Sequence, residues 1–285
     1  MRYKGAMSST SSLRVGTVPY LVGRPLDLGL GDEEGIDLTA AVPARLVEGL
    51  REGSLDVALV SSIELFRREG YGYLPGLAVS GRGYVASVQL FLRRAVEEVR
   101  SIALDPSSRT AATLVRVLLT ERPGGAPEFK EVAAGDDPRE ADCDGWLRIG
   151  DAALREVAAP DAPAVFNPSQ VWCERTGLPF VFAAWVVRPG VDPSPWLAAF
   201  ERARERGLAR LDELAAGAAR DWHLPPELCK RYLREECVFE SLPDMHAALL
   251  AFRDAAAALG LCSGAFDPLP LGDLRPPPPV PCRRE

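Results

Sequence analysis

Two long apolar segments constrain the fold of this chain more than any other feature. Ser87–Leu92 and Phe180–Val187 are almost continuously apolar, and arginine follows each of them, at Arg93 and at Arg188. Strands of this kind are suited to burial on both faces, as at the centre of an α/β sheet. If both strands are also crossovers, the chain leaves a first lobe near residue 92 and returns near residue 178. A cleft would then lie between two lobes joined by a two-strand hinge.

Shorter stretches of the sequence predict further strands and helices in both lobes. Leu13–Val18, Leu55–Val60 and Ser101–Asp105 are predicted strands, and Pro43–Glu52 and Ala111–Leu119 are predicted helices. A doubly wound sheet places its ligand loops at the carboxyl ends of its strands. Hydroxyl residues follow two of these strands, as the pair Ser61-Ser62 and as the turn 107–110. These hydroxyls are expected to face a shared ligand.

The last third of the chain changes to a helical pattern. Helices are predicted over 196–216, 226–236 and 242–259, and they are expected to pack on the first lobe. The proposed division is therefore 13–92 plus 178–266 for the first lobe and 93–177 for the second. Residues 1–12 and the proline-rich 267–285 are expected to be flexible tails.

Composition narrows the classes of partner. The chain has 285 residues, a net charge of −7 and a pI near 5.1, so it lacks the basic stripe that nucleic-acid binding needs. No secretory signal or membrane-spanning segment is evident, so we expect a cytoplasmic protein without a membrane partner. A small anionic ligand would have to be held by local hydrogen-bond donors.

The sequence contains no motif typical of a metal-binding or cofactor-binding site. The six cysteines form no C-x-x-C pair and no zinc spacing with a histidine, so no metal is expected. The two histidines, His223 and His246, both fall in the helical last third, where a catalytic base is poorly placed. No cofactor is expected either.

The turn before the predicted helix at Ala111 is the first candidate binding site. Ser108, Arg109 and Thr110 would stand at the amino end of that helix, where free N–H groups and the helix dipole favour a carboxylate or phosphate. The alternative is an ordinary N-cap beside a surface arginine. The sequence leaves both readings open.

Three further candidates carry the same ambiguity. Ser61 and Ser62 are either ligand-binding hydroxyls or a helix start. Ser87 either faces the cleft, where it is the candidate catalytic residue, or finds a backbone partner. Asp151 either does acid–base work or binds substrate in the second lobe, or it caps the helix that follows Gly150.

Taken together, the chain resembles the chorismate dehydratase family of the futalosine route to menaquinone, whose members are related to type II periplasmic binding proteins. The motifs that carry the resemblance occur in the family's order: Val18-Pro19-Tyr20-Leu21 with Pro25-Leu26, then 55–61, 86–91, 103–105, 107–110, 149–154, and Trp172 with 176–185. The resemblance implies an α/β, two-lobed type II periplasmic-binding-protein-like fold with doubly wound sheets, two crossover strands and a helical C-terminal segment.

The resemblance also implies a reaction and a set of residues. Members remove water from chorismate, a dianion, to form 3-[(1-carboxyvinyl)oxy]benzoate, and their first motif usually continues as Tyr or Phe, Leu, Asn. That asparagine looks like a substrate-contacting residue implicated in catalysis, and this chain has Val22 there. Tyr20 is expected to contact substrate, and Arg24 either replaces the lost donor or faces solvent.

Other functions stay open at this point. A paralogue could act on a related enolpyruvyl compound, and a non-catalytic cytosolic binding protein or sensor could use the same cleft. For the sister enzyme that forms 1,4-dihydroxy-6-naphthoate in a similar fold, the resemblance implies a histidine base in the second lobe. This chain has no histidine between residues 92 and 178. The sequence leaves the oligomeric state open, a homodimer included.

Overall fold

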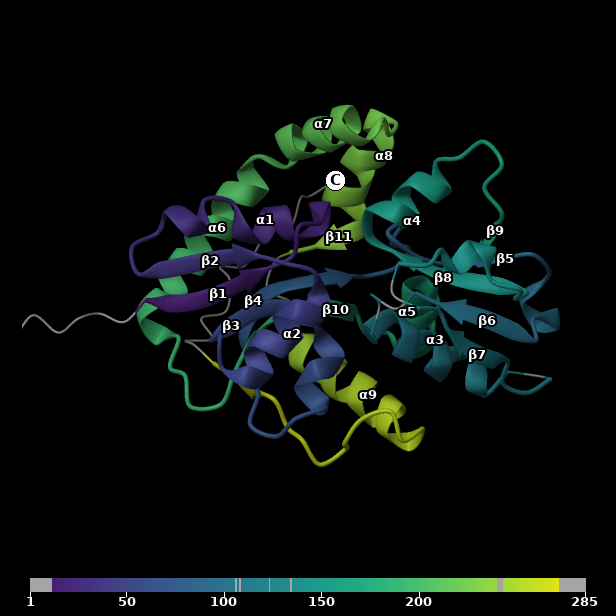
Figure 1. Cartoon of the computed structure of the whole chain (residues 1–285), viewed down its shortest axis with the longest axis horizontal. Helices are drawn as coiled ribbons and strands as arrows, with labels where there is room; N and C mark the ends of the chain where they lie inside the picture. The colour runs from purple at the N-terminus through teal and green to yellow at the C-terminus, as the bar shows by residue number, and fades with distance from the viewer. Residues whose placement is uncertain are drawn as a thin grey trace, which may run out of the picture.

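The structure, a computed structural model, consists of two lobes that are each built on their own β-sheet (Figure 1). It describes residues 12–105, 107, 109–122, 124–133, 135–239 and 243–271. The predicted α/β class with two lobes is confirmed. Residues 1–11 and 272–285 of the predicted tails lie outside the described residues, whereas 267–271 are described and include a short strand, β12 (Leu269–Pro270), paired with β4.

The first sheet is mixed. Its path runs β11-β4-β10-β3-β1-β2, with β12 paired to β4. Strands β3, β1 and β2 are parallel and end at the edge strand β2, whereas β10 runs antiparallel to both of its neighbours. The strands are β1 (Leu13–Thr17), β2 (Ile36–Ala40), β3 (Val57–Ser61), β4 (Gly72–Gly81), β10 (Phe180–Val187), β11 (Cys237–Val238) and β12 (Leu269–Pro270).

The second sheet has the order β7-β6-β8-β5-β9. Its strands are β5 (Val88–Leu92), β6 (Ser101–Leu104), β7 (Glu128–Glu131), β8 (Gly145–Ile149) and β9 (Ala164–Phe166). Strand β5 pairs with β8 over its whole length and with β9 from Leu90 to Leu92, so this apolar segment lies in the second sheet. The chain thus crosses between the sheets at residues 82–87 and returns at 177–179, which differs from the boundary predicted at residue 92.

Helices cover both faces of the first sheet, with α1 and α6 on one side and α2 and α9 on the other (Figure 1). Helices α3, α4 and α5 belong to the second lobe. The helices are α1 (Arg24–Asp27), α2 (Pro43–Glu52), α3 (Arg109–Thr120), α4 (Gly150–Val157), α5 (Pro168–Thr176), α6 (Leu197–Ala209), α7 (Leu211–Trp222), α8 (Pro226–Arg231) and α9 (Met245–Ala258). In the described part of the chain, none of them combines the length and apolar character needed to cross a membrane.

The helical last third differs from its prediction in two places. The helix predicted over 196–216 is divided at Arg210, whose φ of −116° and ψ of 21° leave the helical region. The helix predicted over 226–236 consists of two parts, α8 and a π-helix, Tyr232–Glu236, that follows it directly. The close packing of α6 against α1 requires a glycine at position 207, because a Cβ there would lie 2.1 Å from the carbonyl oxygen of Pro25.

Strand β10 is the centre of the first lobe. Four of its residues, Ala184 to Val187, are fully buried. At its start Trp172 of α5 donates a hydrogen bond from Nε1 to the Pro179 carbonyl at 3.2 Å and packs edge-on against Phe180. The predicted strand and its aromatic anchor are therefore both present.

Asp56 ties three strands of this sheet together. It directly precedes β3, and its carboxylate accepts hydrogen bonds from Arg14 of β1, at 2.7 Å from Nη2, and from Arg188 after β10, also at 2.7 Å from Nη2. Burial acts to raise the pKa of Asp56, but the hydrogen bonds from both arginines outweigh it and hold the pKa at about 2. Because the folded pKa is lowered, this pairing stabilises the fold above pH 4 and is lost as the pH falls towards 2.

We expect Asp56→Asn to lower the free energy of unfolding by about 1 to 3 kcal/mol at pH 7, the range for hydrogen bonds to charged groups. The loss should shrink between pH 4 and pH 2, as measured by urea unfolding across that range. Asp212→Asn is the matched control, since Asp212 pairs with Arg234 in solvent and should contribute little. Equal effects of the two substitutions would contradict the role given to Asp56.

Candidate functional site

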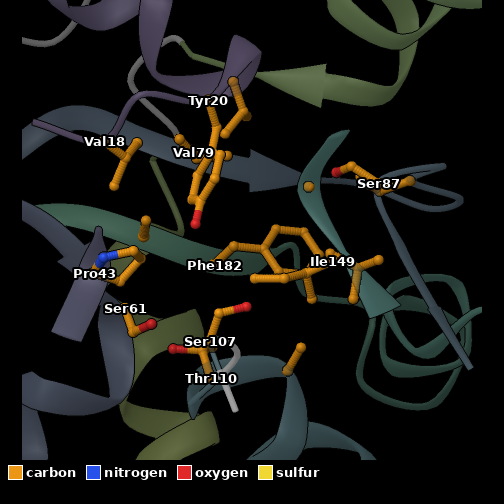
Figure 2. A pocket seen from close by; sticks show the side chains of 16 residues that line it. Val18, Tyr20, Pro43, Ser61, Val79, Ser87, Ser107, Thr110, Ile149 and Phe182 are labelled. Atoms are coloured by element: carbon orange, nitrogen blue, oxygen red, sulfur yellow. The ribbon is translucent and has the colours of Figure 1, made fainter. Parts of the chain in front are cut away.

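A cleft of about 660 Å³, counting the solvent at its mouth, lies where the two lobes meet (Figure 2). Both lobes and the connecting segment 82–87 contribute to its lining. The described residues that line it are Val18, Tyr20, Val22, Pro43, Ser61, Val79, Val85, Ser87, Val88, Ser107, Thr110, Ala111, Ile149, Gly150, Phe182 and Ala183. Mostly apolar walls with a few convergent polar groups are typical of a small-molecule site.

Sheet topology explains why these residues meet. Val18 follows β1, Ser61 ends β3, Ser107 follows β6 and Ile149 ends β8, so the carboxyl ends of parallel strands from both sheets open into one space. This is where α/β sheets place ligands. The predicted position of the ligand loops matches the position of the cleft.

The walls of the cleft are mostly apolar, and among its described lining residues none is charged. Phe182 lies in the middle of the cavity, between Tyr20 and Ile149 (Figure 2). A ligand ring could pack against these side chains. Such walls exclude water, and a hydrogen bond made there is electrostatically stronger than one made in solvent.

The polar side chains that line the cleft are mainly hydroxyls. Ser61, Ser107 and Thr110 gather on one side of the cavity, and Ser87 lies apart from them (Figure 2). Three helices of eight or more residues also begin at the cleft, since Pro43, Thr110 and Gly150 lie in the first turns of α2, α3 and α4. The positive ends of three helix dipoles thus point towards a site where an anion can bind without a basic side chain.

Thr110 joins the two lobes beside the cleft, whereas Ser62 bonds within the first lobe. Thr110 Oγ1 accepts a hydrogen bond from the backbone N–H of Ile63 at 3.2 Å. Ser62, fully buried, donates from Oγ to the Val181 carbonyl at 2.6 Å and does not line the cleft. Of the predicted pair, Ser61 faces the cavity and Ser62 is used in packing.

Tyr20 and Asp151 meet where α4 of the second lobe approaches the first. Burial, and next the charges of Asp105 and Asp151, raise the pKa of the Tyr20 phenol, so it stays a hydrogen-bond donor at neutral pH. Asp151 Oδ1 accepts from the Leu21 N–H at 3.4 Å, and burial raises the pKa of Asp151 to about 6. It is not the helix cap considered from the sequence, because Ile149 holds that position and Asp151 lies in the first turn of α4.

The two predicted arginines do not line the cleft. Arg24 lies 3.7 Å from Asp27, and the exposed Arg109 points towards Glu64 at 4.0 Å. Ser108 lies outside the described residues. The binding turn predicted at 108–110 is thus represented in the cleft by Thr110, together with Ser107.

Ser87 lies in the segment that crosses between the lobes, and it is 6% exposed. Its Oγ accepts a hydrogen bond from the hydroxyl of Tyr232 at 2.8 Å. Sequence reasoning missed Tyr232, since nothing in the local pattern of residues 226–236 distinguishes it from a core tyrosine. It also missed Phe182 as a cleft residue, although the strand that contains it was predicted correctly.

The described residues contain no group of three or more histidine, cysteine or acidic side chains that could hold a metal ion. The polar groups at the cleft are hydroxyls and helix ends. This donor set suits carboxylates.

Comparisons with known proteins identify the family. A family model for menaquinone biosynthesis matches residues 13–258. The chorismate dehydratase of Thermus thermophilus is 34% identical over 266 residues, which cover 85% of this chain and 96% of that protein. The chain belongs to the chorismate dehydratase family. The chorismate dehydratase of Campylobacter jejuni is 30% identical over 175 residues, which cover 59% of this chain and 64% of that protein.

Solved structures show the fold of the family. A protein from Archaeoglobus fulgidus matches with a TM-score of 0.71 at 18% identity, covering 89% of this chain and 100% of that chain. The alkanesulfonate-binding protein SsuA from Xanthomonas axonopodis matches with a TM-score of 0.59 at 18% identity, covering 88% and 94%. The two-lobed architecture is therefore that of periplasmic binding proteins, as the sequence motifs predicted.

Proposed function

We propose that this protein is a chorismate dehydratase of the futalosine route to menaquinone, acting in the cytoplasm. Chorismate would lose the hydrogen at C3 and the hydroxyl at C4 as water, and its enolpyruvyl ether would stay in place. The product is 3-[(1-carboxyvinyl)oxy]benzoate. Formation of the aromatic ring makes the reaction downhill, so the enzyme mainly has to position and stabilise the reacting molecule.

The observation that carries this proposal is the uncharged cleft lined with hydroxyls and helix starts, in a chain of this family. Chorismate is a compact dianion with an apolar ring. In this proposal Ser61, Ser107 and Thr110 bind one carboxylate at the start of α3, and Phe182 packs against the ring. Ser87 on the opposite side would donate to the group that leaves or to the second carboxylate.

The described lining offers donors and no carboxylate, imidazole or amine. The proton acceptor for the C3 hydrogen would then be the substrate itself, a water molecule or a residue outside this lining. Preorganised donors in a dry site stabilise the charge that develops as the C–H bond breaks, and they need no reorganisation to do so.

Product analysis tests the proposal directly. The purified protein is incubated with chorismate, isochorismate or 3-[(1-carboxyvinyl)oxy]benzoate, and the mixtures are analysed by mass spectrometry. We expect loss of 18 mass units from chorismate alone, the mass of one water molecule. Thermal stabilisation by chorismate without any product would contradict catalysis and favour a binding protein.

Val22 lies in the cleft lining. The resemblance to the family's first motif implies an asparagine at this position. Because one donor aimed at a transition state contributes about 10² to 10³ in rate, we expect Val22→Asn to raise kcat for chorismate by about that factor. Initial rates of product formation measure the effect. Val165→Asn, on the exposed edge strand β9, is the matched control and should leave kcat unchanged. A Val22→Asn variant no faster than the native protein would contradict the role of this position.

Ser61 and Ser62 form a natural matched pair for testing the cleft. Ser61→Ala should lower kcat/KM about 10- to 100-fold with little change in Tm, because it removes a hydrogen bond to a charged substrate. Ser62→Ala should lower the free energy of unfolding by about 1 kcal/mol, since it leaves the buried Val181 carbonyl without its donor. The reverse pattern in kinetics and thermal melts would place the ligand elsewhere.

A further inference from the structure

The segment that crosses from the first sheet to the second forms one wall of the cleft through Val85, Ser87 and Val88. Side chains from both lobes fix its backbone. Asn167 of the second lobe donates from Nδ2 to the Val85 carbonyl at 3.0 Å, and Glu236 accepts from the Ala86 N–H at 2.7 Å. This wall is therefore held in one conformation at the position where Ser87 faces the ligand.

The contacts from the first lobe come from an unusual turn. Tyr232 and Glu236 are the first and last residues of the π-helix that follows α8. π-Helical turns are rare, and they occur frequently at functional sites. Arg231 donates to Glu236 at 2.8 Å, so this acidic side chain is itself fixed. The turn places the Tyr232 hydroxyl against Ser87 and the Glu236 carboxylate against the preceding residue.

The hydrogen bond between Tyr232 and Ser87 has a direction. Tyr232 donates and Ser87 Oγ accepts, at 2.8 Å, with Tyr232 only 1% exposed. Burial, and next the neighbouring Cys237, raise the pKa of the Tyr232 phenol well above its usual value, so the donor stays protonated. A serine hydroxyl has one hydrogen of its own and rotates freely until a partner fixes it. With Tyr232 bound to a lone pair of Oγ, the hydrogen of Ser87 is left for a group in the cleft.

We propose that Tyr232 is a positioning residue for this reaction: it orients Ser87 so that the serine hydroxyl donates to the substrate. The inference rests on the proposed function and deepens it. Tyr232 itself does not line the cleft, and its effect passes entirely through Ser87. This distinguishes the proposal from a general contribution of Tyr232 to folding.

A double-mutant cycle tests the proposal on the full-length protein with chorismate as substrate. Tyr232→Phe should lower kcat about tenfold and change KM less, because it removes one orienting hydrogen bond. Ser87→Ala should lower kcat about 100-fold. In the Ser87→Ala background, Tyr232→Phe should have no further effect on kcat, since the group that it orients is gone.

Tyr73→Phe is the matched control. Tyr73 is also buried, 2% exposed, and its hydroxyl pairs with His246 Nδ1 at 3.1 Å, away from the cleft. Tyr73→Phe should leave kcat unchanged, whatever it does to Tm. Additive losses of kcat in the double variant would overturn the proposal, and so would a fall in kcat for Tyr73→Phe equal to that for Tyr232→Phe.

Failure of the proposed function can be distinguished from failure of the positioning role of Tyr232. If the native protein does not convert chorismate, the dehydratase assignment fails, and the same four proteins of the cycle are then compared by calorimetric titration with chorismate. Weaker binding by Tyr232→Phe only in the presence of Ser87 would support the positioning role. Independent effects of the two substitutions on Kd, or no binding by the native protein, would overturn it.

Discussion

The antiparallel pairing of β10 with β3 is the interaction on which the rest of the structure depends. It places Ala183 opposite Ser61 and Trp185 opposite Leu59, and so brings the strand that returns from the second lobe into the middle of the first sheet. Residues after this point add the helices α6 to α9, and residues 88–176 before it build the second lobe. The same pairing puts Phe182 and Ser61 into one cavity. Fold and site are therefore set by a single strand register.

A second constraint is electrostatic. An anion in a cleft without charged lining must be stabilised by oriented dipoles, and here hydroxyl groups and the starts of α2, α3 and α4 can supply them. Because the fold fixes these dipoles, the cleft can bind an anion without a basic side chain. A basic side chain would stabilise the ground state of the substrate as much as the charge that develops in the transition state, and it would therefore not raise kcat. Arg24 and Arg109 stand outside this lining, paired with Asp27 and Glu64.

Much of the fold could be predicted from periodicity, because long apolar or amphipathic stretches leave few alternatives. The helix Pro43–Glu52 and the strand Phe180–Val187 have the predicted bounds. Strand β5 could not be assigned to a sheet, since burial on both faces is compatible with either one. The break at Arg210 shows no signal as strong as proline.

The site could be predicted only in part, because side-chain direction depends on tertiary contacts. Neighbouring residues point to opposite sides, and thus Ser61 faces the cleft whereas Ser62 bonds to Val181. The same limit applies to Asp151, which turned out to contact Leu21 across the lobes. Tyr232 lies 145 residues from the serine that it contacts, a distance over which local patterns carry no information.

The central claim is that the ligand binds between the lobes, held by hydroxyls and helix starts. A crystal structure of the protein with 3-[(1-carboxyvinyl)oxy]benzoate tests it most directly. We expect one carboxylate beside Ser61 and Thr110, the ring against Phe182, and Ser87 within hydrogen-bond distance of the ligand. Ligand density beside the arginines Arg67, Arg109 and Arg116, which line a separate pocket, would contradict it.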